Sequence, residues 1–225
     1  MAWLKSTWGI VTIAAIAVVL VGGIAYFAFF YEDGPEDLEW AADDIDGFWE
    51  GQSEASGFEY VDPKDVVYYT EEEETPCGPT IPNNAFYCSP SHSIYLDLTF
   101  LEQQEAEVGR YAPIYILAHE WGHLIQDDLG ILEGGNFSIQ VELQADCFAG
   151  AYTKDLEERD DRFTDTDLEA AVIQLIQVAD PALYPWFAPG AHGDAEQRVT
   201  SFKVGYDGGY DPCTKAPFAQ PAIDP

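Results

Sequence analysis

Residues 114–125 read Ile-Tyr-Ile-Leu-Ala-His-Glu-Trp-Gly-His-Leu-Ile, with His119, Glu120 and His123 inside an otherwise apolar run. Two histidines four residues apart lie one turn apart on the same face of an α-helix, where both can bind one zinc ion. The glutamate beside the first histidine can reach a water molecule at that metal. A chance pair of histidines is the alternative, but a buried helix must give its polar side chains partners. The stretch therefore predicts a zinc-binding helix in the core.

A catalytic zinc needs a third protein ligand and an open position for water. Glu142 is the best candidate, because it lies in a second predicted helix, residues 138–156. Asp146, one turn further along, points the same way and can accept the second N–H of a ligand histidine, which fixes the tautomer of that histidine. Both carboxylates could instead belong to a solvated face of an acidic protein. We predict that His119, His123 and Glu142 bind Zn²⁺, with Asp146 behind them.

Two other kinds of zinc site fit the sequence less well. The extended motif of the metzincins requires Gly at position 126 and His at position 129, which are Gln126 and Leu129 here, and the only Met is Met1. A purely structural zinc is expected to have four protein ligands and has no need of a further carboxylate beside the metal. The presence of Glu120 therefore favours a catalytic site. A catalytically inactive, zinc-containing binding or assembly module at the cell surface stays as the alternative.

The pattern along the rest of the chain predicts an α+β fold, helix-rich with a small β-sheet. Helical spacing of apolar residues begins near Leu38, and the small residues Ala145, Ala149 and Gly150 would let the second zinc-site helix approach the first closely. Short β-prone runs lie at residues 58–61, 66–69 and 93–98. Helices are predicted after Pro113, across residues 138–156, across residues 166–179 with the capping pattern Thr166-x-x-Glu169, and from near Asp194.

The charge of the chain limits its partners. It has 41 acidic and 9 basic residues in 225, a net charge of −32, so the phosphates of a nucleic acid would be repelled. With 47% apolar and 14% aromatic residues, the chain still has enough material for a core, unlike acidic disordered chains. We therefore expect a folded domain with no nucleic-acid partner.

The amino-terminal stretch differs from the acidic remainder. From Trp8 to Phe30 no residue is charged, which is long enough for a transmembrane helix of about 20 residues. A cleaved signal peptide is the alternative, but its apolar part is usually about 7–15 residues and ends in small side chains. Lys5 precedes the stretch and Glu32-Asp33 follows it, so the amino terminus is expected in the cytoplasm. The predicted order is a cytoplasmic terminus (1–7), a single-pass membrane anchor (8–30), an acidic juxtamembrane segment with the first helix (31–47), an extracytoplasmic domain (48–215) and a tail (216–225).

The four cysteines agree with a domain outside the cytoplasm. An even number in an oxidising compartment predicts two disulfides, for which three pairings are possible. Cys77 and Cys88 flank a turn rich in Gly, Pro and Asn, which could let them meet locally and leave Cys147 to reach Cys213. A cysteine-based zinc site is less well supported, because the chain has no Cys-x-x-Cys pair.

Five further stretches accompany the zinc motif: Cys-Gly-Pro (77–79), Phe-Tyr-Cys-x-Pro (86–90), Ile-Tyr-Leu-Asp-Leu-x-Phe (94–100), Glu-Leu-Gln-Ala-Asp-Cys-Phe-Ala-Gly (142–150) and His-Gly-x-x-x-Gln-Arg-Val (192–199). Together with the zinc motif they resemble a known family, the putative neutral zinc metallopeptidases of bacterial membrane-anchored proteins. The resemblance covers most of the chain from about Trp49 to Cys213.

The resemblance implies a zincin-like metallopeptidase domain of the gluzincin type, which acts on peptide or protein substrates. It implies zinc ligation by His119, His123 and Glu142, with Glu120 as the catalytic residue. It also implies the disulfides Cys77–Cys88 and Cys147–Cys213.

Peptide hydrolysis also requires a donor that stabilises the oxyanion of the tetrahedral intermediate. His192, just before the last predicted helix, is the candidate, because His92 lies in a Ser/Pro turn outside the family motifs. A histidine that only binds backbone at the entry of a helix is the alternative. By analogy with zincins, the predicted strand at residues 93–98 would be the sheet edge that binds an extended peptide.

Overall fold

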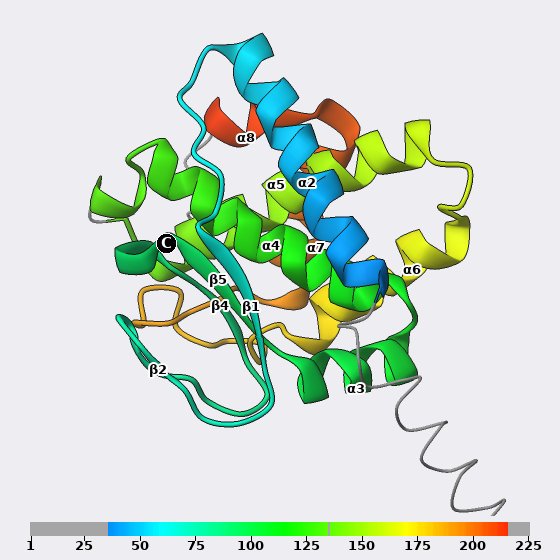
Figure 1. The fold of residues 1–225 in the computed structure, drawn as a ribbon. Helices are drawn as coiled ribbons and strands as arrows, with labels where there is room; N and C mark the ends of the chain where they lie inside the picture. Colours follow the sequence, from blue (N-terminus) through cyan, green and yellow to red (C-terminus); the bar gives the residue numbers. More distant parts are fainter. Residues whose placement is uncertain (1–35, 135, 216–225) are drawn as a thin grey trace, which may run out of the picture. The chain divides into compact units, whose positions relative to one another are not determined.

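The computed structural model describes residues 36–134 and 136–215 (Figure 1). Within these residues no helix is both long enough and apolar enough to cross a membrane. The predicted anchor at residues 8–30 and the predicted tail at residues 216–225 lie outside the described residues.

The described chain is helix-rich and carries a small sheet, which confirms the predicted α+β class. The helices are α2 (Glu36–Ser56), α3 (Leu98–Val108), α4 (Tyr111–Asp128), α5 (Ser138–Arg159), α6 (Asp165–Gln177), α7 (Ala195–Gly208) and α8 (Tyr210–Lys215). The strands are β1 (Asp65–Tyr69), β2 (Glu74–Thr75), β3 (Gly78–Pro79), β4 (Ala85–Cys88) and β5 (Ser93–Asp97). Short 3-10 turns lie at Ser89–Ser91 and Leu132–Gly134.

Three helix starts differ from the prediction. Helix α4 begins at Tyr111 rather than after Pro113, because a proline in the first turn removes no intrahelical hydrogen bond. The predicted strand ends at Asp97, whose carboxylate accepts the N–H groups of Thr99 and Phe100 and so begins α3, a helix that the periodicity did not indicate. The N-cap of helix α6 is Thr164, two residues before the predicted cap Thr166, so the helix begins at Asp165. The predicted strand at residues 58–61 is not a strand.

The main sheet has the strand order β1-β5-β4. Strand β1 pairs in parallel with β5, from Asp65 opposite Ser93 to Tyr69 opposite Asp97. Strand β4 pairs antiparallel with β5 on its other side. The prediction that residues 93–98 form the sheet edge is therefore wrong: β5 is the middle strand, and β1 and β4 are the edges.

Helix α4 is the buried centre of the fold, between β4 and α5 (Figure 1). Gly122 permits the approach of α5, since a Cβ at that position would lie 2.9 Å from the Cα of Ala145. Gly150 does the same for α7, since its Cβ would lie 2.1 Å from the carbonyl oxygen of Phe202. The predicted close contact between the two zinc-site helices is confirmed, and it extends to a third helix.

Helix α2 belongs to the same core. Its residues Leu38, Ala41, Ile45 and Trp49 are at most 1% exposed and recur at helical spacing. The predicted boundary at residue 48 falls in the middle of this helix.

Both disulfides form as the family resemblance implied. Cys77–Cys88 joins the β2–β3 hairpin to the last residue of β4. Cys147–Cys213 joins α5 to α8.

Candidate metal centre

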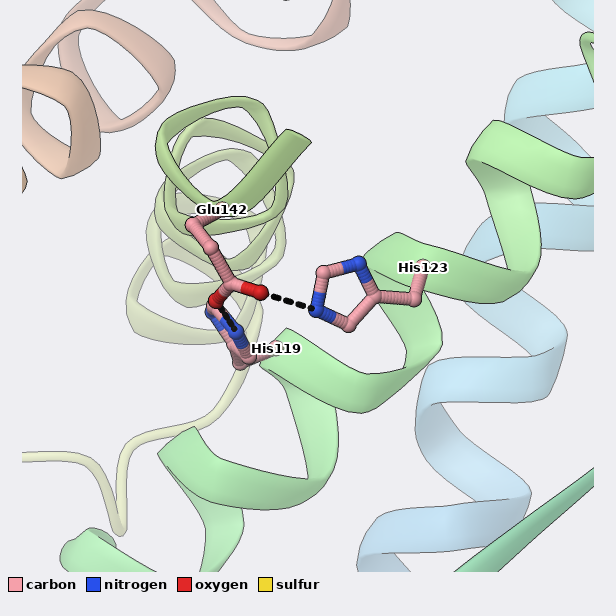
Figure 2. Close-up of side chains that lie close together, drawn as sticks. All are labelled: His119, His123 and Glu142. Carbon is pink, nitrogen blue, oxygen red and sulfur yellow. Dashed lines mark hydrogen bonds and ion pairs between the residues drawn. The ribbon is translucent and has the colours of Figure 1, made fainter. Parts of the chain in front are cut away.

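The three predicted metal ligands meet at one point in the fold. His119 and His123 project from α4 and Glu142 faces them from α5 (Figure 2). The Nε2 atom of His119 lies 3.2 Å from Oε2 of Glu142, and Nε2 of His123 lies 3.6 Å from Oε1 of the same carboxylate. Their ligand atoms all lie within 4.8 Å of one another.

This donor set fits zinc. Tetrahedral zinc with bonds of about 2.0–2.2 Å has ligand atoms roughly 3.3–3.6 Å apart, close to the two distances between the carboxylate and the imidazoles. Two imidazoles and one carboxylate leave the fourth position for water, as in catalytic sites. All three residues line a cleft of about 520 Å³, so that position is open to a substrate.

A buried ionic network lies behind His119. Its Nδ1 atom is 2.8 Å from Oδ1 of Asp146, which is 0% exposed. The same carboxylate accepts two hydrogen bonds from Arg198, at 2.7 and 2.8 Å, and one from the hydroxyl of Tyr115, at 2.5 Å. The predicted position of Asp146 agrees with the structure, and the contact orients His119 so that Nε2 faces the metal position.

The pKa shifts of the two acids agree with these roles, whereas His119 must release a proton in order to bind a metal. Burial raises the pKa of Asp146, but the charge and hydrogen bonds of Arg198 outweigh it and hold the pKa below its ordinary value. Burial likewise raises the pKa of Glu142, and the two histidines lower it overall. Burial lowers the pKa of His119, but the hydrogen bonds and charges of Asp146 and Glu142 raise it to about 10. Both acids are thus carboxylates at neutral pH, as a metal ligand and its support must be.

A chain of amides lies behind His123. Its Nδ1 atom is 2.9 Å from Oε1 of Gln126. Gln126 in turn donates to the carbonyl of Val141 and to the side chain of Gln144, and Gln144 donates to the carbonyl of Cys213. The second ligand histidine is therefore oriented through α5 as far as the Cys147–Cys213 disulfide.

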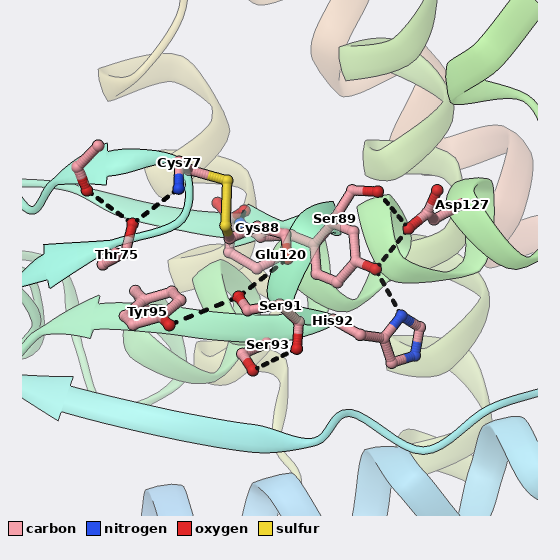
Figure 3. The surroundings of a disulfide bond; sticks show 12 residues. Thr75, Cys77, Cys88, Ser89, Ser91, His92, Ser93, Tyr95, Glu120 and Asp127 are labelled. Carbon is pink, nitrogen blue, oxygen red and sulfur yellow. Dashed lines mark hydrogen bonds between the residues drawn. A yellow bond between two sulfur atoms is a disulfide. The ribbon is translucent and has the colours of Figure 1, made fainter.

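Glu120 lies in the cleft beside the three ligands. Its side chain is not part of the ligand cluster, and its Oε2 atom accepts the backbone N–H of Tyr87 in β4 at 2.9 Å. Figure 3 shows Glu120 close to the end of β4 where Cys88 closes the first disulfide. The carboxylate thus lines the same cleft as the three ligands without belonging to their cluster.

His192 also lines the cleft, between α6 and α7. Its side chain is 47% exposed, and its Nδ1 atom lies 3.8 Å from Asp180. The carboxylate of Asp180 accepts the backbone N–H groups of His192 and Gly193, which holds the base of this loop. His92, by contrast, does not line the cleft; it contacts Tyr87 and Val61.

Comparison with known proteins agrees with the geometry. The family model described as putative neutral zinc metallopeptidase matches residues 39–215. The chain belongs to this family. It is 33% identical to the uncharacterized protein YpfJ of Escherichia coli (strain K12) over 184 residues, 72% of this chain and 63% of that protein. It is 31% identical to the uncharacterized protein Rv2575 of Mycobacterium tuberculosis (strain ATCC 25618 / H37Rv) over 163 residues, 60% of this chain and 56% of that protein. The chain thus spans less than two thirds of the length of these relatives, and no solved structure matches it significantly.

Three residues that support the site were not assigned from the sequence. Arg198 lies in the motif at residues 192–199, but nothing in the motif indicates that it neutralises Asp146 across the core. Gln126 was noted only because it breaks the metzincin pattern. Tyr87 acts through its backbone N–H, which any residue except proline would offer, so its side-chain type gave no signal.

Proposed function

We propose that this protein is a membrane-anchored zinc metallopeptidase that hydrolyses peptide bonds outside the cytoplasm. The observation that carries the proposal is the combination of three converging ligands, an open side toward the cleft, and the non-ligand carboxylate of Glu120 next to them. Membership in a metallopeptidase family supports the same reaction class. The substrate is a peptide or protein.

The roles of the residues follow from their positions. His119, His123 and Glu142 hold the metal in the gluzincin arrangement, and zinc, when bound, makes water acidic enough to act at neutral pH and polarises a carbonyl group. Glu120 takes the proton of the attacking water and delivers it to the leaving amine. Asp146 holds the imidazole of His119 in the tautomer that its ligand role requires.

The oxyanion of the tetrahedral intermediate also needs a donor. His192 is the proposed donor, because it lines the same cleft as the metal ligands and its loop is held by Asp180. Loss of one such donor typically costs about 10²–10³ in kcat.

Strand β4 is the proposed binding edge for the substrate. It lies on the cleft side of the sheet, and Ala85, Phe86 and Tyr87 line the cleft. An extended peptide can add to such an edge through backbone hydrogen bonds, while its side chains enter the cleft.

Two observations support the proposed location of the domain outside the cytoplasm. Residues 8–30 contain no charge and would span the membrane once, with the amino terminus in the cytoplasm. The two disulfides of the body suit an oxidising compartment on the other side.

The decisive experiment uses the full-length chain, produced in a host that forms disulfides. Bound metal and hydrolysis of a peptide library are measured for the wild type, Glu120→Gln and His119→Ala. We expect zinc in the first two proteins and cleavage by the wild type alone. Zinc without cleavage in the wild type would favour the inactive binding module. Zinc content unchanged by His119→Ala would contradict the assigned metal site.

A further inference from the structure

The carboxylate of Glu120 is held by the edge strand of the sheet rather than by its own helix. Among the described residues, the backbone N–H of Tyr87 is its one hydrogen-bond donor, at 2.9 Å from Oε2. In the antiparallel pair β4–β5, alternate residues turn their backbone groups away from the partner strand. This N–H therefore points into the cleft, and the position of β4 decides where the carboxylate lies.

The side chain of Tyr87 fixes that position on the same helix. Its hydroxyl donates to Oδ2 of Asp127 at 2.7 Å. Glu120 and Asp127 are seven residues apart in α4, two turns along nearly the same face. Tyr87 thus contacts α4 twice, once through its backbone and once through its hydroxyl, and these two contacts together hold β4 to the helix.

Neighbouring side chains complete the anchor. Ser89 donates to the same oxygen of Asp127 at 2.7 Å (Figure 3). The Nδ1 atom of His92 lies 2.7 Å from the Tyr87 hydroxyl. The other ring nitrogen of His92 lies 3.0 Å from the carbonyl oxygen of Val61. The hydroxyl of Tyr87 is therefore held by two side chains from two different segments.

We propose that Tyr87 is a positioning residue for Glu120, and that the Tyr87–Asp127 hydrogen bond keeps the carboxylate at the correct distance from the metal position. The inference rests on the proposed function, since it assigns Glu120 the proton transfer. One oxygen of the carboxylate is taken by the Tyr87 N–H, which leaves Oε1 for the proton of the attacking water. Without the anchor, β4 can move away from α4 and Glu120 loses its one fixed contact.

The test compares the full-length wild type with Tyr87→Phe and Asp127→Ala, because alanine, unlike asparagine, leaves no oxygen to accept the Tyr87 hydroxyl. Tyr87→Phe keeps the ring and the backbone N–H and removes only the anchor. The matched controls are Tyr206→Phe and Glu157→Ala, which remove a similar tyrosine–carboxylate hydrogen bond of 2.6 Å outside the cleft. Zinc content, kcat and KM for a cleaved peptide, and the exchange rate of the amide hydrogen at position 87 by NMR are measured for each protein.

We expect both cleft variants to lower kcat by about 10- to 100-fold, with KM within about threefold and zinc content unchanged, because only the proton transfer is misplaced. The double variant should lose no more than either single variant, since both break one contact. The amide at position 87 should exchange at least about tenfold faster than in the wild type, and the two controls should match the wild type in every readout.

Unchanged kcat and unchanged amide exchange in Tyr87→Phe would overturn the proposal. A higher KM or a lower zinc content with an unchanged kcat would also overturn the proposal. Tyr87 would then support the fold or the metal rather than Glu120. The amide exchange does not depend on catalysis. If the wild type binds zinc and cleaves nothing, the proposed function fails. The exchange rate of the amide at position 87 in Tyr87→Phe then still shows whether the Tyr87 hydroxyl holds the N–H against Glu120.

Discussion

The two walls of the cleft hold their functional groups in different ways. On the helix side, His119 is supported by Asp146, which is completely buried and paired with the buried guanidinium of Arg198. On the sheet side, Glu120 is supported by one backbone N–H, and the anchor behind it ends on Asp127, which is partly exposed. A buried ion pair is expensive to break, whereas hydrogen bonds near water are replaced at little cost.

The buried support of His119 and the partly exposed support of Glu120 suit the different roles proposed for these two residues. A metal site requires ligand atoms at set distances, and a buried support that cannot exchange with water maintains them. Glu120 is not one of the three clustered ligands, so loss of its support should lower kcat and leave zinc binding and most of the stability intact. The following changes test this difference, from the largest expected effect to the smallest.

Asp146→Asn should have the largest effect. It leaves the guanidinium of Arg198 buried without its counter-ion, so we expect a loss of about 3–5 kcal/mol in the free energy of unfolding. Zinc affinity should fall by about 10- to 100-fold because the acceptor of His119 loses its negative charge. Denaturant unfolding and competition with a chelator measure the two quantities. The control is Asp155→Asn, a partly exposed acid of the same helix that should change neither by much.

Loss of the disulfide on the helix side should cost more stability than loss of the disulfide on the sheet side. Cys147–Cys213 closes 66 residues and Cys77–Cys88 closes 11. Replacing the first pair by serine should cost about 4 kcal/mol of unfolding free energy and the second about 3. Only the first should also weaken zinc binding, because Cys213 supports the amide chain behind His123. Equal zinc affinity in both double variants would contradict the assigned link.

Gly122→Ala should loosen the contact between the two ligand-bearing helices. The added Cβ would lie 2.9 Å from the Cα of Ala145, so a loss of about 1–3 kcal/mol in unfolding free energy is expected, together with weaker zinc binding. Gly51→Ala is the matched control, since its Cβ in helix α2 would meet no atom within 4 Å. That variant should gain up to about 1 kcal/mol. Thermal unfolding with and without zinc separates the two results.

The dependence of stability on pH gives the mildest test. The pKa of Asp146 is lowered in the folded protein, so its contribution to stability is complete above the unfolded value of about 4 and is lost as the pH falls through the folded value. The unfolding free energy of the metal-free wild type should therefore fall more steeply in acid than that of Asp146→Asn. Urea unfolding at a series of pH values below about 5 measures both slopes. Parallel slopes would mean that this carboxyl is not stabilised in its charged form.

The success of sequence reasoning depended on how local each feature is. His119 and His123 were predicted because their spacing alone places them on one helical face. Glu142 and Asp146 followed because a second helix could present them together, and small residues in it allowed a close approach. Strand order was not accessible in this way, because β1 pairs with β5 across intervening segments, and nothing local indicates that β4 rather than β5 is the edge.

The sequence by itself indicated the candidate metal ligands, the helix-rich class and, through family resemblance, the two disulfides. Each of these depends on residue type at short spacing or on a recognisable motif. Only the tertiary structure decided that Arg198 neutralises Asp146 and that the backbone of Tyr87 holds Glu120. Both contacts join segments far apart in the chain, and the second uses a backbone group that every residue but proline carries. A linear pattern has no means to record such contacts, because packing in three dimensions creates them.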